Sequence, residues 1–439
     1  MTITKSEYDA LLKKGALLDQ TMTDKRSQAT SSPASVLELK YVDRASTSGS
    51  QATSDKGIVD LSGRILQDQD GAMRYLGASS GSAFLTDLRA YMATVVIGLN
   101  ATTPGLMSTE SDFISALGKY QTHDSRPLAA TTGDPMTLPT SNEALKMLSE
   151  FRYWIQDGAA TVESGGTYFF RSIDQLVQEY EDHLENPSLE FDALSMASIN
   201  AAFAVACQID PSCGPEWDVN GQTFFARAKD LVGNPLETSS IGDATVLALM
   251  GFYLLNSNRR DAAYMYLSIA MHITLVHGVH QAWQVEEDGK RLFWNLYCID
   301  RWLAMLVGRP VMIEDPYIKL DMPREAKGLP SPRGLCAQIE LSRISHFIGA
   351  HIYDSTGAKF GNMRGRMGEA LDRLALWQTN LPDILQYTGT SFSQDRAVYE
   401  LRMHHNQVHS SFEFEGNWLT SLSWSSSLSD LYCSVQSRT

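Results

Sequence analysis

A serine between two glycines has the spacing of a catalytic group. Gly77-Ala78-Ser79-Ser80-Gly81 matches the Gly-x-Ser-x-Gly nucleophile elbow, in which a strained turn between a strand and a helix exposes the serine of a hydrolase. Such a turn needs parallel strands rich in Val and Ile around it, whereas the rest of this chain has helical patterns. We interpret the segment as a Gly/Ser turn that leads into a helix with Ser79 or Ser80 as its N-cap. A serine hydrolase that uses Ser79 is the alternative function.

Two histidine pairs have spacings that could ligate a metal on a helix: His277 with His280, and His405 with His409. Neither pair has an obvious third ligand nearby, and a histidine at a helix C-terminus is favoured by the helix dipole in any case. The cysteines are scattered without a Cys-x-x-Cys pair, which indicates core thiols in a reducing compartment. They are Cys207, Cys213, Cys298, Cys336 and Cys433. We expect no metal and no cofactor, and the sequence has no P-loop or dinucleotide fingerprint.

Two adjacent charges, Asp300 and Arg301, stand in an otherwise apolar helical segment. The segment has an apolar stripe from 292 to 306, acidic residues before it, and Gly308 followed by Pro310 where a helix would end. Aromatic residues on its other sides predict that the helix is buried. Adjacent residues of a helix do not face each other, so we expect each charge to need its own partner. Arg309 and Glu314 are the candidates.

Helical patterns on both sides of this segment predict an all-α fold, a compact array of many helices. Residues 192–207 are rich in small residues, which let helices approach closely, and predict a central helix. Residues 241–255 and 259–277 predict a helical hairpin around the turn at 256–258. Two further apolar stripes follow, at 339–348 and 371–381.

Composition separates the two ends of the chain from this helical body. Residues 1–70 are crowded with Ser and Thr and poor in large apolar residues, which predicts a disordered arm. Residues 408–439 predict an irregular Ser-rich tail, because they have no helical period. The sequence therefore predicts three parts, with a folded body at 71–407 between the arm and the tail.

The net charge of the chain is -15, from 36 basic and 51 acidic residues. This balance argues against a body that binds nucleic acid or an anionic membrane, because both kinds of surface need basic patches. The apolar runs are too short or too polar to span a bilayer, so we expect a soluble protein with no membrane partner.

The buried helix and the Gly/Ser turn together resemble a known family. They are similar to the fungal-specific transcription factor domain, the regulatory middle region of fungal zinc binuclear cluster transcription factors, and the resemblance covers roughly 71–407. The residues that carry it are Arg74, Tyr75, Gly77, Ser80, Gly81, Arg291, Trp294, Tyr297, Asp300, Arg301, Gly308, Arg309, Pro310 and Pro323.

The resemblance implies a transcription regulator in the nucleus rather than an enzyme. The family's zinc module, a six-cysteine cluster ahead of the regulatory domain, does not occur in this sequence. We therefore expect the chain to reach DNA only indirectly. The resemblance further implies a regulatory and dimerising body, as a homodimer or a heterodimer with related transcription factors. It also implies a response to a small-molecule effector.

Overall fold

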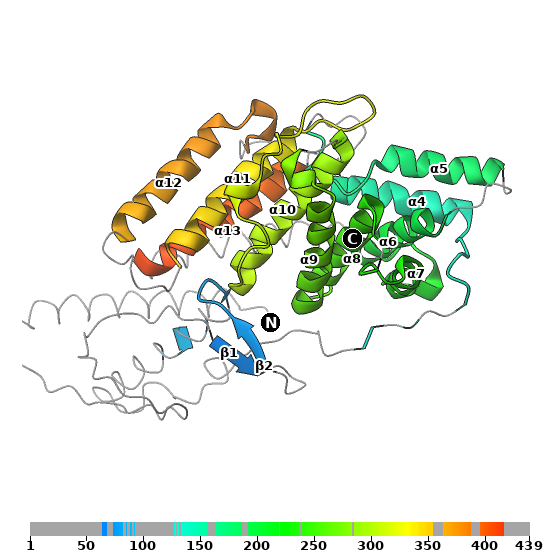
Figure 1. Ribbon diagram of the computed structural model, residues 1–439, viewed down its shortest axis with the longest axis horizontal. Helices are drawn as coiled ribbons and strands as arrows, with labels where there is room; N and C mark the ends of the chain where they lie inside the picture. The colour runs from blue at the N-terminus through cyan, green and yellow to red at the C-terminus, as the bar shows by residue number, and fades with distance from the viewer. Residues whose placement is uncertain are drawn as a thin grey trace, which may run out of the picture. The chain divides into compact units, whose positions relative to one another are not determined.

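The computed structural model describes most of the chain between residues 64 and 416. The described residues are 64–67, 73–80, 133–156, 164–186, 192–218, 220–237, 239–282, 285–353, 363–387 and 396–416, and the single positions Gly81, Leu85, Leu88, Arg89, Met92, Pro127, Leu128 and Ala130. Helices make up most of this part, and the all-α fold class is confirmed (Figure 1).

A small β-hairpin precedes the helices. Strand β1 (Arg64–Gln67) pairs antiparallel with β2 (Met73–Leu76), in a register that sets Arg64 opposite Leu76. Strand β1 falls inside the predicted arm at 1–70, and the sequence did not predict it. The reason is length, because strands of four residues show no periodicity that could be recognised in the sequence. The rest of the predicted arm lies outside the described residues.

The first helices surround one that is buried almost throughout. They are α4 (Ser141–Phe151), which continues as a π-helical turn (Arg152–Gln156), α5 (Ile173–Glu185), α6 (Ala193–Ile209) and α7 (Gln222–Val232). Asp192 is the N-cap of helix α6, and its carboxylate accepts from the Ser195 N–H at 2.6 Å. Its small side chains let α4, α7 and α8 pack closely around it, which confirms the predicted central helix.

The predicted helical hairpin is confirmed by α8 (Ile241–Asn256) and α9 (Arg260–Val276). Asn258, in the turn between them, has a positive φ of 56°. Helices α8 and α9 both pack into the main core, to which α4–α7, α10 and the start of α11 also contribute.

The helix with the two adjacent charges is α10 (Glu287–Val307), and it is buried over nearly its whole length. Gly308 ends it in the left-handed conformation at φ 67°, as the sequence predicts. A second core lies between the last helices, α11 (Arg333–His351), α12 (Met363–Asn380) and α13 (Arg396–Gly416). Short 3-10 turns occur at Glu216–Asp218, Val279–Gln281, Asp315–Tyr317 and Asp383–Leu385.

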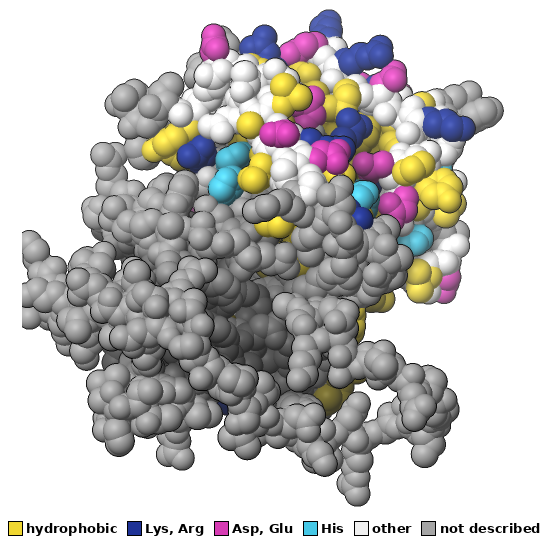
Figure 2. Space-filling view, turned by 90° about the vertical axis from the view of Figure 1, so that its left-hand side faces the viewer, with side chains coloured by type: hydrophobic (Ala, Val, Ile, Leu, Met, Phe, Trp, Pro, Cys, Tyr) yellow, Lys and Arg dark blue, Asp and Glu magenta, His cyan; other side chains and the backbone are white. Residues whose placement is uncertain are grey.

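Helix α13 runs past the boundary at 407 that the sequence predicted for the folded body. The Ser residues beyond that point hid the continuation of the helix, and the rest of the predicted tail lies outside the described residues. Figure 2 shows that basic, acidic and apolar side chains are mixed on the described part of one face. Within the described residues, no helix combines the length and the apolar character needed to cross a membrane.

Candidate functional site

Two segments of the resemblance that lie far apart in sequence meet in the structure. The Gly77 N–H, just after β2, donates to the carbonyl oxygen of Val307 at 2.9 Å. A Cβ on Gly77 would lie 1.8 Å from the carbonyl oxygen of Gly308, and a Cβ on Gly308 would lie 2.3 Å from Gly77 Cα. Because no side chain fits at these distances, the contact requires glycine at both positions. We call it the glycine junction.

One carboxylate joins the two arginines beside the glycine junction. Asp261, in the first turn of α9, accepts from Arg74 of β2 at 2.9 Å and from Arg309 at 2.5 Å. The three side chains are at most 24% exposed, so solvent screens the pairs less than it would at the surface. The guanidinium of Arg309 also lies 5.2 Å from the ring centroid of Tyr264. These contacts tie the hairpin to α9 and to the end of α10.

The predicted N-cap and the alternative nucleophile lie in the same turn. Ser80 is buried and immediately precedes the first helical residue, Gly81, as the turn interpretation predicts. The Ser79 hydroxyl donates to the carbonyl oxygen of Met305 at 3.0 Å. Among the described residues, no histidine or carboxylate hydrogen-bonds to Ser79, and the strand before it belongs to an antiparallel hairpin. The turn therefore has the strand–turn–helix order of an elbow without the parallel sheet or the base.

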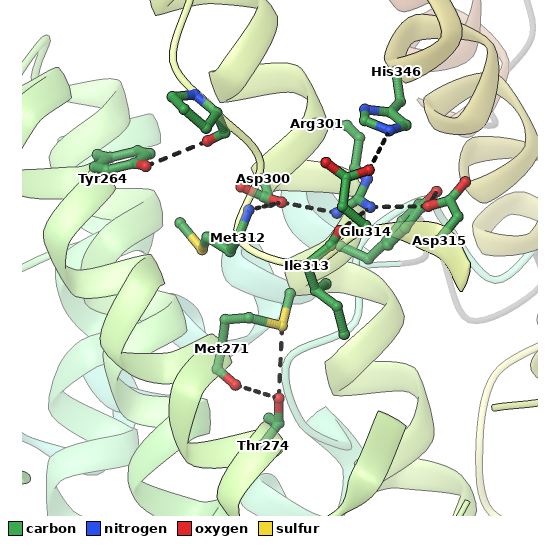
Figure 3. Close-up of polar contacts among 12 residues, drawn as sticks. Tyr264, Met271, Thr274, Asp300, Arg301, Met312, Ile313, Glu314, Asp315 and His346 are labelled. Atoms are coloured by element: carbon green, nitrogen blue, oxygen red, sulfur yellow. Dashed lines mark hydrogen bonds and ion pairs between the residues drawn. The ribbon is translucent and has the colours of Figure 1, made fainter. Parts of the chain in front are cut away.

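Asp300 and Arg301 pair with each other, contrary to the sequence-based expectation. Arg301 Nη1 donates to Asp300 Oδ2 at 2.8 Å, and both side chains are about 1% exposed or less. The two expected partners are engaged elsewhere, since Arg309 binds Asp261 and Glu314 lies 3.1 Å from a ring nitrogen of His346. The expectation failed because the long arginine side chain reaches its neighbour under a loop that folds back over the helix (Figure 3).

The loop at 312–315 closes over this ion pair. The Met312 N–H donates to Asp300 Oδ2 at 3.0 Å. Arg301 Nη2 donates to the carbonyl oxygen of Ile313 at 2.5 Å and to Asp315 Oδ1 at 2.9 Å. These contacts appear in Figure 3. We call Asp300, Arg301 and the residues bound to them the buried charge cluster.

Tyr297 completes the buried charge cluster one turn earlier on α10. Its hydroxyl donates to Asp315 Oδ1 at 2.8 Å, and the Arg301 guanidinium lies 3.7 Å from the centre of its ring. Burial raises the pKa of Asp300 to about 6, although Arg301 and the Met312 N–H favour the ionised form. The oxygen Asp300 Oδ1 is buried and has no hydrogen-bond partner among the described residues. The cluster thus holds a carboxyl group with a raised pKa inside a packed core.

The first half of α10 holds the loop that leads to α11. The Arg291 guanidinium donates to the carbonyl oxygens of Pro330 at 2.5 Å and Arg324 at 2.8 Å, and Trp294 Nε1 donates to that of Asp321 at 2.9 Å. Pro323 lies in the same loop, and its carbonyl oxygen accepts from the Cys336 thiol at 3.6 Å.

The sequence analysis did not predict the partners of Arg74, Arg309, Asp300 and Arg301. Asp261 and Asp315 gave only the signal of acidic residues at the start of a helical segment, and Met312 acts through its backbone. Two members of the resemblance stand apart from the buried contacts: Tyr75 is 50% exposed, and a Cβ on Gly81 would meet nothing within 4 Å. Pro310 contributes its carbonyl oxygen, which accepts from the Tyr264 hydroxyl at 3.4 Å.

The histidine pairs make other contacts. A ring nitrogen of His277 lies 3.0 Å from the carbonyl oxygen of Ser239, and His405 stacks on Trp377 at 5.5 Å between ring centroids. In the part of the chain that the structure describes, no three His, Cys, Asp or Glu residues are grouped so as to hold a metal. A cleft of about 90 Å³ lies beside the second core. It is lined by Trp377, Gln378, Leu381, Leu385, Gln386, Tyr387, Val398, Leu401, Arg402 and His405.

Comparison with known proteins finds a matching family for part of the chain. Residues 167–332, which include α5–α10, match the family described as the fungal specific transcription factor domain. The chain is 22% identical over 368 residues to an uncharacterized transcriptional regulatory protein of Schizosaccharomyces pombe, a match that covers 80% of this chain and 45% of that protein. It is 23% identical over 350 residues to filamentous growth regulator 27 of Candida albicans, covering 75% of this chain and 41% of that protein.

A third relative is cutinase transcription factor 1 alpha of Fusarium vanettenii, 25% identical over 244 residues, with 48% of this chain and 26% of that protein covered. No solved structure matches the chain. The chain spans less than half the length of these relatives. Residues 167–332 match a fungal specific transcription factor domain, and the homologues of the chain are fungal transcriptional regulators.

Proposed function

We propose that this chain is the regulatory body of a fungal transcription regulator that acts in the nucleus. The domain match at 167–332 and the regulator names of its homologues support this function. The structural observation that carries the proposal is the glycine junction. It binds Gly77, which lies ahead of the matched domain, to the end of α10 inside that domain. The regulatory body therefore includes the whole hairpin and the last helix, and we place it at 64–416.

In this proposal the buried residues of the resemblance build the scaffold that binds partners and do not themselves contact a ligand. The buried charge cluster is closed over by its loop, and the cleft of about 90 Å³ beside the second core is small compared with the roughly 300–1,000 Å³ of typical ligand pockets. We place homodimer or heterodimer contacts with related regulators, and any effector, on the surface of this scaffold. Sedimentation velocity over a range of concentrations tests dimerisation.

Contact with DNA is indirect in this proposal. The chain carries a net charge of -15, and electrostatic contacts to phosphates supply most non-specific affinity. We expect the purified chain to leave DNA unshifted in a mobility assay at moderate salt. A shift that specific DNA competes away and random DNA does not would contradict this part of the proposal.

A tethering assay tests the function itself. The full chain is fused to a heterologous DNA-binding module in a fungal host, with a reporter gene that carries the module's site. We expect reporter transcription to differ several-fold from that with the module alone, and Gly77→Ala to abolish the difference while Gly81→Ala preserves it. A folded, nuclear fusion that leaves the reporter at the level of the module alone would contradict the proposed function.

A further inference from the structure

The cleft beside the second core, which α12, α13 and the turn after α12 line, has a buried apolar floor. Leu385, Val398 and Leu401 on this floor are at most 2% exposed. Trp377 and His405 add a flat wall, with their ring planes 16° apart and their ring centroids 5.5 Å apart. A floor of this kind favours an apolar group, because binding removes apolar surface from water.

The rim of the same cleft carries a cation without an anionic partner. Arg402 of α13 is partly buried, and its guanidinium lies 5.9 Å from the centre of the Tyr387 ring. Arg402 makes no hydrogen bond or ion pair with any residue that the structure describes. Among the described residues that line the cleft, none is Asp or Glu, although the chain has 51 acidic and 36 basic residues.

A single guanidinium above an apolar floor selects one class of ligand. Arginine binds a carboxylate through two parallel hydrogen bonds, which are stronger than bonds between neutral groups. A cationic ligand would meet Arg402 and no carboxylate of the lining, and a multiply charged anion would need more than one cation. The lining therefore fits a ligand with one carboxylate and an apolar chain.

The size of the cleft limits the apolar part of this ligand. The cleft has a volume of about 90 Å³, whereas an engineered apolar cavity that binds benzene has about 150 Å³. The floor is therefore too small for an aromatic ring and fits a short aliphatic chain. Its residues are held by packing in the second core, so the cleft is formed before a ligand enters.

We propose that this cleft is a binding site for short-chain aliphatic monocarboxylates, with the chain on the apolar floor and the carboxylate against the Arg402 guanidinium. None of the residues that line the cleft belongs to the resemblance, so the site is separate from the glycine junction and from the buried charge cluster. The proposal concerns binding by the purified chain, and it does not depend on the proposed function.

Ligand-observed NMR of the full chain tests the proposal with isovalerate as the probe. Isovaleramide keeps the shape of the probe without its charge, and acetate keeps the carboxylate without the branched chain. We expect saturation transfer from the protein to the isovalerate methyl protons, and a dissociation constant at least about tenfold lower than that of either comparison compound. The proposal is overturned if millimolar isovalerate receives no transfer, or if isovaleramide or acetate binds as tightly as isovalerate.

Two variants that each remove one positive charge locate the site, with circular dichroism as the check on folding. We expect Arg402→Gln to weaken isovalerate binding at least about tenfold. Arg373→Gln is the matched control and should bind like the parent, because Arg373 is exposed on α12, pairs with Glu369 at 2.6 Å and does not line the cleft. Unchanged binding by Arg402→Gln, or an equal loss in both variants, would overturn the proposal. The three compounds on the parent protein decide it even if Arg402→Gln does not fold.

Discussion

Gly77 and Gly308 are in backbone contact, and this contact attaches the β-hairpin to the end of the buried helix α10. Gly308 has a positive φ of 67°, so a substitution there would add backbone strain to the steric clash. At Gly77 the clash is the main effect, because its neighbour is the backbone of Gly308, which has no flexible side chain to move aside. A side chain at either position would therefore disrupt the glycine junction, by a clash at Gly77 and by a clash with added backbone strain at Gly308.

Gly77→Ala should destabilise the protein, since its Cβ would lie 1.8 Å from the Gly308 carbonyl oxygen. We expect a loss of about 1–3 kcal/mol in the free energy of unfolding, the usual range for overpacking. Gly81→Ala is the matched control, because a Cβ there meets nothing within 4 Å. Urea denaturation of the two variants beside the parent measures the difference. Equal midpoints for both variants would mean that the glycine junction is loose in solution.

Asp300→Asn should remove a pH dependence of stability. The carboxyl has a pKa of about 6 in the folded protein and an ordinary value of 3.8, so folding favours its neutral form. The stabilisation is therefore complete below about pH 4 and is lost as the pH rises through about 6, because the folded state binds the extra proton in this range. Two pKa units correspond to about 3 kcal/mol at most.

The measurement for Asp300 is the unfolding free energy of the parent minus that of Asp300→Asn, from pH 4 to pH 7. Groups that titrate in both proteins cancel in this difference. We expect the difference to fall as the pH rises. A difference that stays constant over the range would show that folding does not raise the pKa of the Asp300 carboxyl.

Trp294→Ala should cost about 3–5 kcal/mol, the usual cost of truncating a buried aromatic side chain. The indole is fully buried, and its N–H donates to the Asp321 carbonyl oxygen at 2.9 Å, so the variant also leaves that oxygen without its partner. Trp217→Ala is the control, because that indole is 54% exposed and should cost less. Thermal unfolding of both variants gives the comparison, and a Trp294→Ala protein that melts with the parent would contradict a structural role.

Ser79 should not react as a nucleophile, because its hydroxyl donates to the Met305 carbonyl oxygen and no base is hydrogen-bonded to it among the described residues. A fluorophosphonate probe should therefore leave the parent unlabelled. Ser79→Ala serves as the control for any background labelling. Labelling of the parent that disappears in this variant would restore the hydrolase as the function of the Gly77–Gly81 turn.

The sequence was most informative where one element alone determines the structure. The apolar stripe, the acidic first turn and the Gly308 cap of α10 are local signals, and the helix follows them to its end. The same holds for the turn between α8 and α9 and for the small residues of α6. Such features depend on neighbours a few residues away, and their periods can be read from the chain.

Contacts between distant segments could not be read in this way. The pairing of Asp300 with Arg301 depends on the loop at 312–315, which folds back over the helix and binds both side chains. Likewise, Asp261 is one acidic residue among many until the hairpin and the end of α10 bring Arg74 and Arg309 to it. The resemblance named Arg74, Asp300 and Arg309, but only the fold shows what each of them touches.

Arg301→Ala shows whether the charged residues of α10 are structural. This variant removes the cation from Asp300, Asp315 and the Ile313 carbonyl oxygen, and leaves Asp300 buried without its ion pair. Breaking one side of a buried pair costs about 3–5 kcal/mol, so chemical denaturation should show a loss of that size or an unfolded protein. An Arg301→Ala protein that unfolds with the free energy of the parent, yet fails in the tethering assay, would contradict the structural role and assign Arg301 to a binding site.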